Sequence, residues 1–325
     1  MKIRAIRIAE TGGPEVLKLE DYDLPDPGPG EIRVRVKAAG VNYIDTYQRS
    51  GLYKVPLPSG LGLEAAGLVE ALGPGVTRVK IGERVAYANG PPGTYAEAHN
   101  VRADRVVKIP PGVSDEQAAA LMLKGLTVRY LIKQTYPVKS GETVLWHAAA
   151  GGVGLIACQW LKALGVSVIG TVGSEAKAQL ARAHGAEHII LYRKEDVAKR
   201  VRELTGGKGV PVVYDSVGKD TFVGSLDSLQ VRGLMVSFGN ASGPVTGVDL
   251  GILSQKGSLY LTRPTAFDYT RTSEELDEAA ADLFDAVARG WVKVEIHQRY
   301  KLADAAQCHR DLESRKTTGA SIILP

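Results

Sequence analysis

Cysteine is scarce in this chain, which carries two in 325 residues. Cys158 and Cys308 lie far apart, without a CxxC pair or the spacing of metal ligands. This pattern excludes a disulfide framework and does not indicate a cysteine zinc site. Cys158 falls in an apolar segment with helical spacing, where we expect a small buried hydrophobe.

Long apolar runs are absent as well. No stretch approaches the roughly 20 apolar residues of a membrane span. Residues 1–8 alternate charged and apolar side chains, and no signal-peptide core follows them. We therefore interpret residues 1–8 as an edge strand, and we expect a cytoplasmic protein without a membrane partner.

Aromatic side chains and excess charge are also limited. Phe, Trp and Tyr make up 6% of the chain, and the formal net charge is +4, spread along the sequence. The sequence has no arginine-rich strip and no stacked aromatic motif of the kind that binds RNA. Nucleic-acid binding is therefore not expected as the main function, whereas a small anionic ligand needs only a few local cations.

The length and the pattern of the chain indicate two domains. Hydrophobic residues make up 44% and charged residues 23%, as in ordinary globular proteins, and 325 residues are many for one core. Residues 1–125 contain short strands separated by Gly and Pro, which predicts a β-rich, barrel-like domain. A capping-box pattern, Ser114-x-x-Gln117, then begins an alanine-rich helix.

From Thr143 onward, predicted strands and helices alternate. The predicted strands are 143–147, 166–172, 188–191, 210–215, 233–239 and 258–262. The first predicted helix ends at residue 164, and the next ones span 174–183, 195–204 and 221–229. This alternation predicts a doubly wound parallel sheet of the α/β class. A helix entered through Thr272-x-x-Glu275 and a mixed tail follow. We therefore expect a domain at 126–264, inserted between the two parts of another domain at 1–125 and 265–325.

A glycine-rich turn separates the first of these strands from its helix. The residues Ala149-x-Gly151-x-x-Gly154 form a conservative version of the dinucleotide fingerprint. The small residue and Gly151 allow a tight turn beside a pyrophosphate, and Gly154 allows the helix to pack close to the strand. The free N–H groups at the helix start favour phosphate. In this strand-turn-helix context the motif predicts a nucleotide site, although a lone match also fits a turn that serves packing only.

The end of the second strand indicates which dinucleotide binds. An NAD-preferring site places an acidic residue about twenty positions past the glycine turn. Here the strand ends at 170–174 without Asp or Glu, and Glu175 lies one step later, inside the helix start. Ser174, Lys177 and Tyr192 are able to hydrogen-bond or neutralise a 2′-phosphate. The sequence therefore favours NADPH over NADH; the alternative is that Lys177 is a solvated helix lysine.

Segments that run nearly from end to end of the chain resemble one known family. They are 12–17 (GGPEVL), 40–45 (GVNYID), 49–53 (RSGLY), 58–67 (PSGLGLEAAG), 124–127 (KGLT), the glycine turn, 214–218 (YDSVG) and 237–240 (SFGN). On these segments the chain resembles the zinc-independent medium-chain dehydrogenases/reductases of the quinone oxidoreductase, or zeta-crystallin-like, group. The resemblance implies a GroES-like catalytic domain, a Rossmann domain that binds NADPH, a cofactor cleft between them, and a homodimer. The apolar strand 258–262 offers an edge for pairing between subunits.

Zinc-binding relatives of this family differ from the chain at the metal positions. They place a cysteine where this chain has the Asn42 region and a histidine within Gly-His-Glu, whereas this sequence has Leu63 before Glu64. Leu63 cannot ligate a metal, and the cysteine cluster of the structural zinc site is missing from 87–100. A site without a Lewis acid suits an acceptor that is already electrophilic, such as a quinone. We therefore expect no metal, and we expect Glu64 to be buried and paired.

The resemblance also implies the residues of the site. The candidate catalytic residues are Asn42, Asp45 and Tyr53, with Tyr47 beside them at the nicotinamide end. Two interpretations of Tyr53 stay open: it stacks on a quinone or donates a proton to it, or it simply packs its ring. The implied cofactor-binding residues are Asn42, Tyr47, Lys124, Tyr130, Gly151, Gly152, Val153, Gly173, Ser174, Lys177, Tyr192, Ser216, Phe238, Gly239, Asn240, Arg263, Pro264 and Thr265.

Three functions stay open at this point. The first is an NADPH:quinone oxidoreductase, which passes electrons or hydride to a small-molecule quinone. The second is an NADPH-dependent 2-alkenal or enone double-bond reductase, because the same metal-free site can deliver hydride to an activated alkene. The third is binding of AU-rich RNA, as in some relatives, which the composition does not favour. The six histidines, His147 among them, show no partner spacing, so we expect each to be satisfied or exposed.

Overall fold

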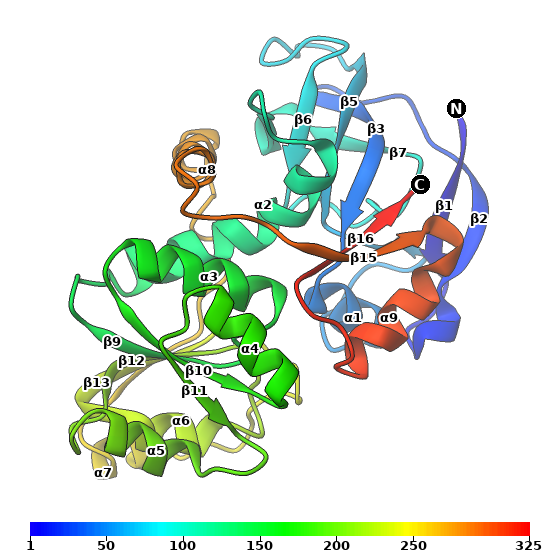
Figure 1. The fold of residues 1–325 in the computed structure, drawn as a ribbon. Helices are drawn as coiled ribbons and strands as arrows, with labels where there is room; N and C mark the ends of the chain where they lie inside the picture. Colours follow the sequence, from blue (N-terminus) through cyan, green and yellow to red (C-terminus); the bar gives the residue numbers. More distant parts are fainter. The chain divides into compact units, whose positions relative to one another are not determined.

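The computed structural model describes residues 1–325 as two compact units. The first unit comprises Met1–Leu126, Tyr269–Phe284 and Val294–Pro325, and the second comprises Thr127–Asp268 and Asp285–Lys293. Both ends of the chain therefore lie in the first unit, and the second unit is formed by two segments between them (Figure 1). None of the helices is long and apolar enough to cross a membrane.

The first unit is built mainly from antiparallel strands. A small sheet has the order β2-β1-β4, and a larger sheet has the order β15-β16-β3-β5-β6-β8, with β7 also paired to β3. The strands are β1 (Lys2–Ile8), β2 (Lys18–Asp23), β3 (Glu31–Gly40), β4 (Ser59–Gly60), β5 (Glu64–Leu72), β6 (Arg84–Tyr87), β7 (Ala98–Arg102), β8 (Val106–Lys108), β15 (Ile296–Lys301) and β16 (Ala320–Leu324). This mixed, largely antiparallel architecture is the predicted GroES-like domain.

One prediction for this unit is wrong. The N-terminal strand β1 is not an edge strand, because it lies between β2 and β4. Its first residues alternate because Ile3 and Ala5 are buried on one face while Lys2 and Arg4 are exposed on the other. Farther along the strand, Ile6 and Ile8 are buried on that second face. Alternation reports one buried face of a strand, and it does not distinguish an edge position from a central one.

Short helices complete the first unit. They are η1 (Pro14–Val16), α1 (Tyr43–Ser50), η2 (Ala103–Arg105), η4 (Leu302–Asp304) and α9 (Ala305–Glu313), while α2 (Asp115–Tyr130) and α8 (Ser273–Ala288) each contribute residues to both units. The predicted capping box at the start of α2 is confirmed. Gln117 N donates to Ser114 Oγ at 3.1 Å, and Ser114 N donates to Gln117 Oε1 at 2.9 Å.

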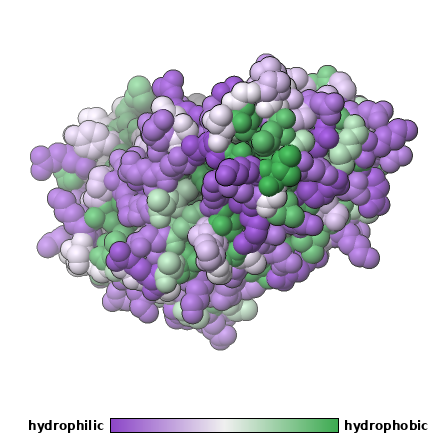
Figure 2. Space-filling view, turned by 90° about the horizontal axis from the view of Figure 1, so that it is seen from above, coloured by the Kyte–Doolittle hydropathy of each residue, from purple (hydrophilic) through white to green (hydrophobic).

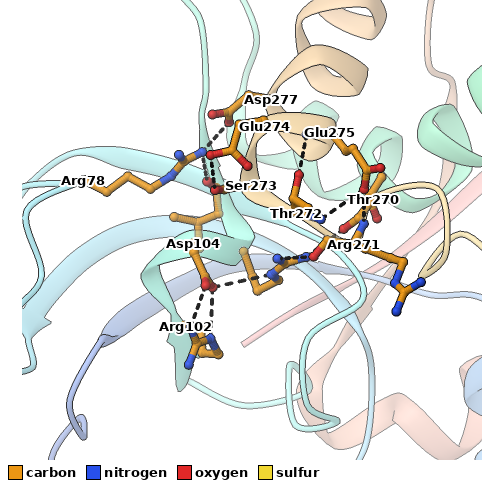
Figure 3. Close-up of polar contacts among 12 residues, drawn as sticks. Arg78, Arg102, Asp104, Thr270, Arg271, Thr272, Ser273, Glu274, Glu275 and Asp277 are labelled. Carbon is orange, nitrogen blue, oxygen red and sulfur yellow. Dashed lines mark hydrogen bonds and ion pairs between the residues drawn. The ribbon is translucent and has the colours of Figure 1, made fainter.

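Arginine side chains bind the segment that begins α8 to the rest of the first unit (Figure 3). Arg105 donates to the carbonyl oxygens of Thr270 and Arg271 at 2.7 and 2.6 Å. Arg78 forms an ion pair with Asp277 on the first turns of the helix. The helix start is itself capped as predicted, because Glu275 N donates to the side chain of Thr272 at 3.2 Å and Thr272 N donates back to Glu275.

The second unit is a six-stranded parallel sheet with the order β11-β10-β9-β12-β13-β14. Its strands are β9 (Thr143–Trp146), β10 (Ser167–Val172), β11 (His188–Leu191), β12 (Val210–Asp215), β13 (Leu229–Ser237) and β14 (Tyr260–Thr262). Its helical segments are η3 (Leu131–Thr135), α3 (Gly152–Ala163), α4 (Glu175–Ala183), α5 (Val197–Leu204), α6 (Phe222–Ser228) and α7 (Gly251–Gln255). Helices α3 and α4 cover one face of the sheet, and α5 and α6 cover the other (Figure 1). The predicted doubly wound sheet is confirmed.

Two details of this unit differ from the sequence prediction. Strand β13 begins at Leu229 instead of Gly233, because it contains an irregularity at which Arg232 adopts a φ of 61°. The register with β12 jumps there, which explains why the sequence pattern resumes at Gly233. The five-residue helix α7 was not predicted, because one turn is too short to establish a helical period.

The surface is polar over most of the face seen in Figure 2, with smaller apolar groups between the hydrophilic residues. Apolar side chains are nevertheless exposed at the β14 edge of the parallel sheet. Val231, Tyr260 and Leu261 are 68%, 61% and 37% exposed. Strand β14 pairs only with β13, so its other side carries unpaired backbone groups.

Candidate cofactor-binding and catalytic residues

The glycine turn at the end of β9 is shaped by close backbone contacts. Gly151 is the N-cap of α3, and Gly151 to Val153 are half-buried at the helix start. A Cβ atom on Gly154 would lie 2.5 Å from the Ala148 carbonyl oxygen, so only glycine allows the helix to approach the strand this closely. The first N–H groups of an α-helix have no partner within the helix. The backbone of this turn therefore has the shape and the free N–H groups that suit a phosphate.

The tip of β10 brings a hydroxyl and a cation together. Ser174 caps α4 and its side chain accepts a hydrogen bond from Lys177 N at 3.4 Å. Strand β11 runs parallel to β10, and Tyr192 N donates to Val172 O at 3.2 Å just beyond it. A Cβ atom on Gly173 would lie 2.7 Å from Tyr192 Oη and 3.5 Å from Arg193 Nε.

Arg193 is a candidate residue that the sequence analysis missed. Parallel neighbouring strands end at the same edge of a sheet, so the residues after β11 reach the tip of β10. Tyr192 was predicted at this strand tip, and its neighbour Arg193 was not. No acidic side chain follows β10 until Glu175, so Ser174, Lys177, Tyr192 and Arg193 give this strand tip the chemistry that a 2′-phosphate needs.

The turns after β12 and β13 pack against each other. A Cβ atom on Gly239 would lie 2.3 Å from the Ser216 carbonyl oxygen, so glycine is required at this contact. Arg263, which follows β14, donates to Ser237 Oγ at 3.1 Å and to Gly239 O at 2.9 Å. The ring of Phe238 lies 5.7 Å from that of Trp146. The structure thus brings Ser216, Gly239 and Arg263 together at the ends of these strands. Of the other predicted residues there, Asn240 and Pro264 are half-buried and Thr265 is exposed.

A buried polar chain behind these turns was not predicted. His147 Nδ1 lies 3.0 Å from Thr171 Oγ1, and its Nε2 lies 2.9 Å from Ser225 Oγ, which donates to Asp215 Oδ2 at 2.7 Å. Burial lowers the pKa of His147, so the ring is neutral. Asp215 also accepts from Val217 N and Gly218 N, which shapes the turn at Ser216. His147 is satisfied, as expected, and links the ends of three strands.

In the first unit, a second polar chain surrounds the start of α1. Asn42 is the N-cap of this helix, and its backbone N–H donates to Asp45 Oδ2 at 2.8 Å. Asn42 Nδ2 donates to Glu64 Oε2 at 2.8 Å, and Lys124 Nζ donates to the same oxygen at 3.1 Å. Leu123 N donates to the other carboxylate oxygen of Glu64 at 2.7 Å. The expectation that Glu64 is buried and paired is confirmed, since it is 0% exposed.

The remaining predicted residues have clear packing roles. The rings of Tyr47 and Tyr53 meet edge to face with centroids 5.3 Å apart, and Tyr53 N donates to Tyr47 O at 3.0 Å. Tyr53 therefore packs its ring on Tyr47 while it remains half-exposed. Tyr130 is buried in the second unit, and Lys124 is buried in the first.

The residues at the position of a catalytic zinc do not fit a metal. Leu63 is a buried aliphatic side chain, and the oxygens of Glu64 are already occupied by Asn42, Leu123 and the ammonium group of Lys124. No group of three or more His, Cys, Asp or Glu side chains is arranged to hold a metal ion.

The antiparallel first unit and the Rossmann-type second unit, with its glycine turn, define the class of medium-chain dehydrogenases/reductases. Two family models match the chain: the alcohol dehydrogenase GroES-like domain over residues 28–111, and the zinc-binding dehydrogenase over residues 152–286. A quinone oxidoreductase of Pseudomonas aeruginosa is 60% identical over 99% of both chains. The crystal structure of Escherichia coli quinone oxidoreductase complexed with NADPH matches with a TM-score of 0.98 and 56% identity, covering 99% of this chain and 100% of that one.

A third relative carries a different name. The 2-haloacrylate reductase of a Burkholderia species is 44% identical over 99% of both chains. The higher identities are to proteins named quinone oxidoreductases. The chain therefore belongs to the quinone oxidoreductase group of the medium-chain dehydrogenase/reductase family.

Proposed function

We propose that the protein is an NADPH:quinone oxidoreductase that works without zinc. The observation that carries this proposal is the 60% identity, over nearly the whole chain, to a protein named quinone oxidoreductase. The local geometry supports it. The residues at the zinc position are engaged in hydrogen bonds or are aliphatic, and a quinone is electrophilic enough to accept reducing equivalents without a Lewis acid.

The cofactor assignment rests on the second unit. Gly151, Gly152 and Val153 would hold the pyrophosphate of NADPH at the start of α3, where a side chain on Gly154 has no room. Ser174, Lys177 and Tyr192, with Arg193 added, would hold the 2′-phosphate, since no carboxylate stands at the tip of β10 to repel it. Bound NADPH would supply the hydride, and the protein would orient it and exclude water.

The other predicted positions have supporting roles in this proposal. In the second unit, Tyr130 and the residues at the ends of β12, β13 and β14 would complete the cofactor site: Ser216, Phe238, Gly239, Asn240, Arg263, Pro264 and Thr265. In the first unit, Asn42, Asp45 and Lys124 would act at the nicotinamide end. Tyr47 and the half-exposed Tyr53 would line the same end, Tyr53 offering its ring and hydroxyl to a quinone.

The test is oxidation of NADPH, with NADH in parallel, in chelator-treated buffer. The acceptors are a benzoquinone, a naphthoquinone, an ortho-quinone and a linear 2-alkenal. We expect rapid oxidation of NADPH with the quinones and little with the alkenal. No turnover of any quinone, despite tight binding of NADPH, would overturn the proposal.

One relative supports a second candidate, reduction of an activated carbon-carbon double bond. The name 2-haloacrylate reductase denotes a substrate with such a bond, and that protein is 44% identical to this chain. Both reactions draw on the same cofactor site and differ only in the acceptor. Turnover of the alkenal in place of the quinones would favour this candidate.

We also propose a homodimer that pairs through β14 and acts in the cytoplasm. The exposed Tyr260 and Leu261 lie on a strand with one unpaired edge, which suits association with a second copy. Cys158 and Cys308 are both free and buried, which suits a reducing compartment. Light scattering should give twice the chain mass for the native protein and the chain mass for Leu261→Lys. A monomeric native protein would exclude this arrangement.

A further inference from the structure

A chain of buried polar side chains ends on Asp45 in the first unit. Arg49 is nearly buried, and it forms an ion pair with Glu313 at 2.7 Å and lies 3.3 Å from His309 Nδ1. His309 Nε2 lies 3.3 Å from Tyr95 Oη, and Tyr95 donates to Asp45 Oδ2 at 2.7 Å. Asp45, Tyr95 and His309 are each 0% exposed.

The direction of every hydrogen bond in this chain is fixed by Arg49. A guanidinium group has donors and no acceptor, so His309 Nδ1 must accept from it. The neutral ring then carries its proton on Nε2 and donates to Tyr95 Oη, which leaves the tyrosine proton for Asp45. Burial, and to a smaller extent the charge of Arg49, lowers the pKa of His309 to about 3. This low pKa agrees with a neutral ring.

The two oxygens of Asp45 are in different situations. Oδ2 accepts from Tyr95 Oη and from Asn42 N, both of which are uncharged donors. Oδ1 is buried and has no hydrogen-bond partner. An ionised carboxylate with an unpartnered buried oxygen is costly. A proton on Oδ1 removes that charge and leaves both hydrogen bonds to Oδ2 intact.

Burial of Asp45 favours the neutral acid, and the charges around it act in both directions. The titratable and charged groups that face it are Glu64 of β5, Tyr95, Lys124 of α2, Cys308 and His309 of α9, and, through His309, Arg49 of its own helix. Asn42 links Asp45 to Glu64, so two buried carboxyl groups share one neighbour. The one cation in contact with this pair is Lys124, and it lies on Glu64. Burial is the largest effect and raises the pKa of Asp45 to about 7. The hydrogen bonds from Tyr95 and Asn42 and the charge of Lys124 oppose this rise, and the charge of Glu64 adds to it.

We propose that Asp45 is a positioning residue that works as a neutral acid and holds Asn42 at the start of α1. This inference rests on the NADPH:quinone reaction proposed above. Asp45 acts through the backbone N–H of Asn42, whose side chain is tied to Glu64 and thereby to Lys124. When Asp45 loses its proton, Oδ1 becomes a buried anion that needs a donor or water. The start of α1 then rearranges, and Asn42 moves with it.

The test compares Asp45→Asn with Asp45→Ala between pH 6 and 8.5. The amide of Asn keeps an oxygen acceptor for Tyr95 and Asn42 and places an uncharged NH₂ group where Oδ1 stands, so it imitates the neutral acid. The dissociation constant of NADPH is measured by nicotinamide fluorescence, with kcat and KM for a benzoquinone alongside. The 2′-phosphate titrates in the same range, so the ratio of wild type to Asp45→Asn is the quantity that reports Asp45.

We expect NADPH binding by the wild type to weaken relative to Asp45→Asn by about tenfold as the pH rises through 7. Asp45→Ala should bind more weakly at every pH, and kcat should change less than KM. The matched control is Asp196→Asn, an exposed carboxylate that caps α5, which should keep the wild-type pH profile. If Asp45→Asn keeps the wild-type profile, or binds as weakly as Asp45→Ala, the proposal is wrong. A protein that binds NADPH and reduces no quinone would refute the proposed function while the binding titrations still decide the role of Asp45.

Discussion

The candidate site of the second unit is formed mainly by backbone atoms, whereas that of the first unit is formed by side chains. In the second unit the site is mostly backbone: Gly154, Gly173 and Gly239 stand where any Cβ atom would meet a neighbour within 3 Å. In the first unit the site is made of buried side chains, with Asp45 and Glu64 at its centre. Backbone N–H groups carry no titratable proton, whereas buried carboxyl groups respond to pH.

This difference predicts how each site responds to substitutions and to pH. A site made of backbone is insensitive to pH and intolerant of added atoms. A site made of buried side chains tolerates replacements that keep the shape and depends on the protonation of its members. We therefore expect substitutions at the glycine turn to act through size and substitutions at Asp45 to act through protonation.

The largest effect is expected at the glycine turn. Gly154→Val places a branched side chain against the Ala148 carbonyl oxygen, only 2.5 Å from the new Cβ. We expect a loss of about 3 kcal/mol, or more than 100-fold, in NADPH binding measured by isothermal titration. Gly224→Ala is the matched control, since no atom lies within 4 Å of its Cβ position. Normal cofactor binding by Gly154→Val would show that the helix is able to shift.

A smaller effect, confined to one cofactor, is expected at the tip of β10. Lys177→Ala should weaken NADPH binding by roughly 1.5–3 kcal/mol and leave NADH binding unchanged, because only NADPH carries the 2′-phosphate. Arg193→Ala should show the same selectivity, since its guanidinium lies beside Gly173. Lys199→Ala, on the exposed surface of α5, serves as the control. Equal losses for both cofactors would contradict the assignment of this strand tip.

Counted per pH unit, the smallest effect is the pH dependence of stability that Asp45 causes in the first unit. The pKa of Asp45 is about 7 in the folded protein and 3.8 in a free side chain. Between these values the folded state keeps a proton that the unfolded state releases, so stability decreases as pH rises through this window. The decrease is at most about 1.4 kcal/mol per pH unit. Asp45→Asn removes this dependence, so the wild type should lose stability relative to the variant from pH 4 to 7 in urea unfolding.

The comparison with the variant is needed because histidines act in the opposite direction. Burial lowers the pKa of His99 to about 4 and of His309 to about 3, from 6.5 in a free side chain. Their contribution is present above pH 6.5 and is lost as pH falls toward those values. These groups are unchanged in Asp45→Asn. A difference between the two proteins that stays constant from pH 4 to 7 would therefore contradict a neutral Asp45.

Much of the second unit could be predicted from the sequence. The glycine turn and the alternating strands and helices are local patterns, set by backbone geometry within a few residues. The capping boxes at Ser114 and Thr272, which belong to the first unit, are local in the same sense. The absence of a carboxylate at the tip of β10 is equally local. Strand order follows almost directly, because right-handed crossovers leave few arrangements for such an alternation.

Only the tertiary structure decided which distant residues meet. Asp45 and Tyr95 are 50 positions apart, and Tyr95 and His309 are 214 apart. Arg193 reaches Gly173 only because β11 lies beside β10, and β1 is central only because β4 adds to its second side. Sequence periodicity reports which face of an element is buried, whereas the choice of partner depends on packing between segments far apart in the chain. The sequence by itself therefore determined the elements and the backbone site, and the fold determined the buried network that gives Asp45 its proton.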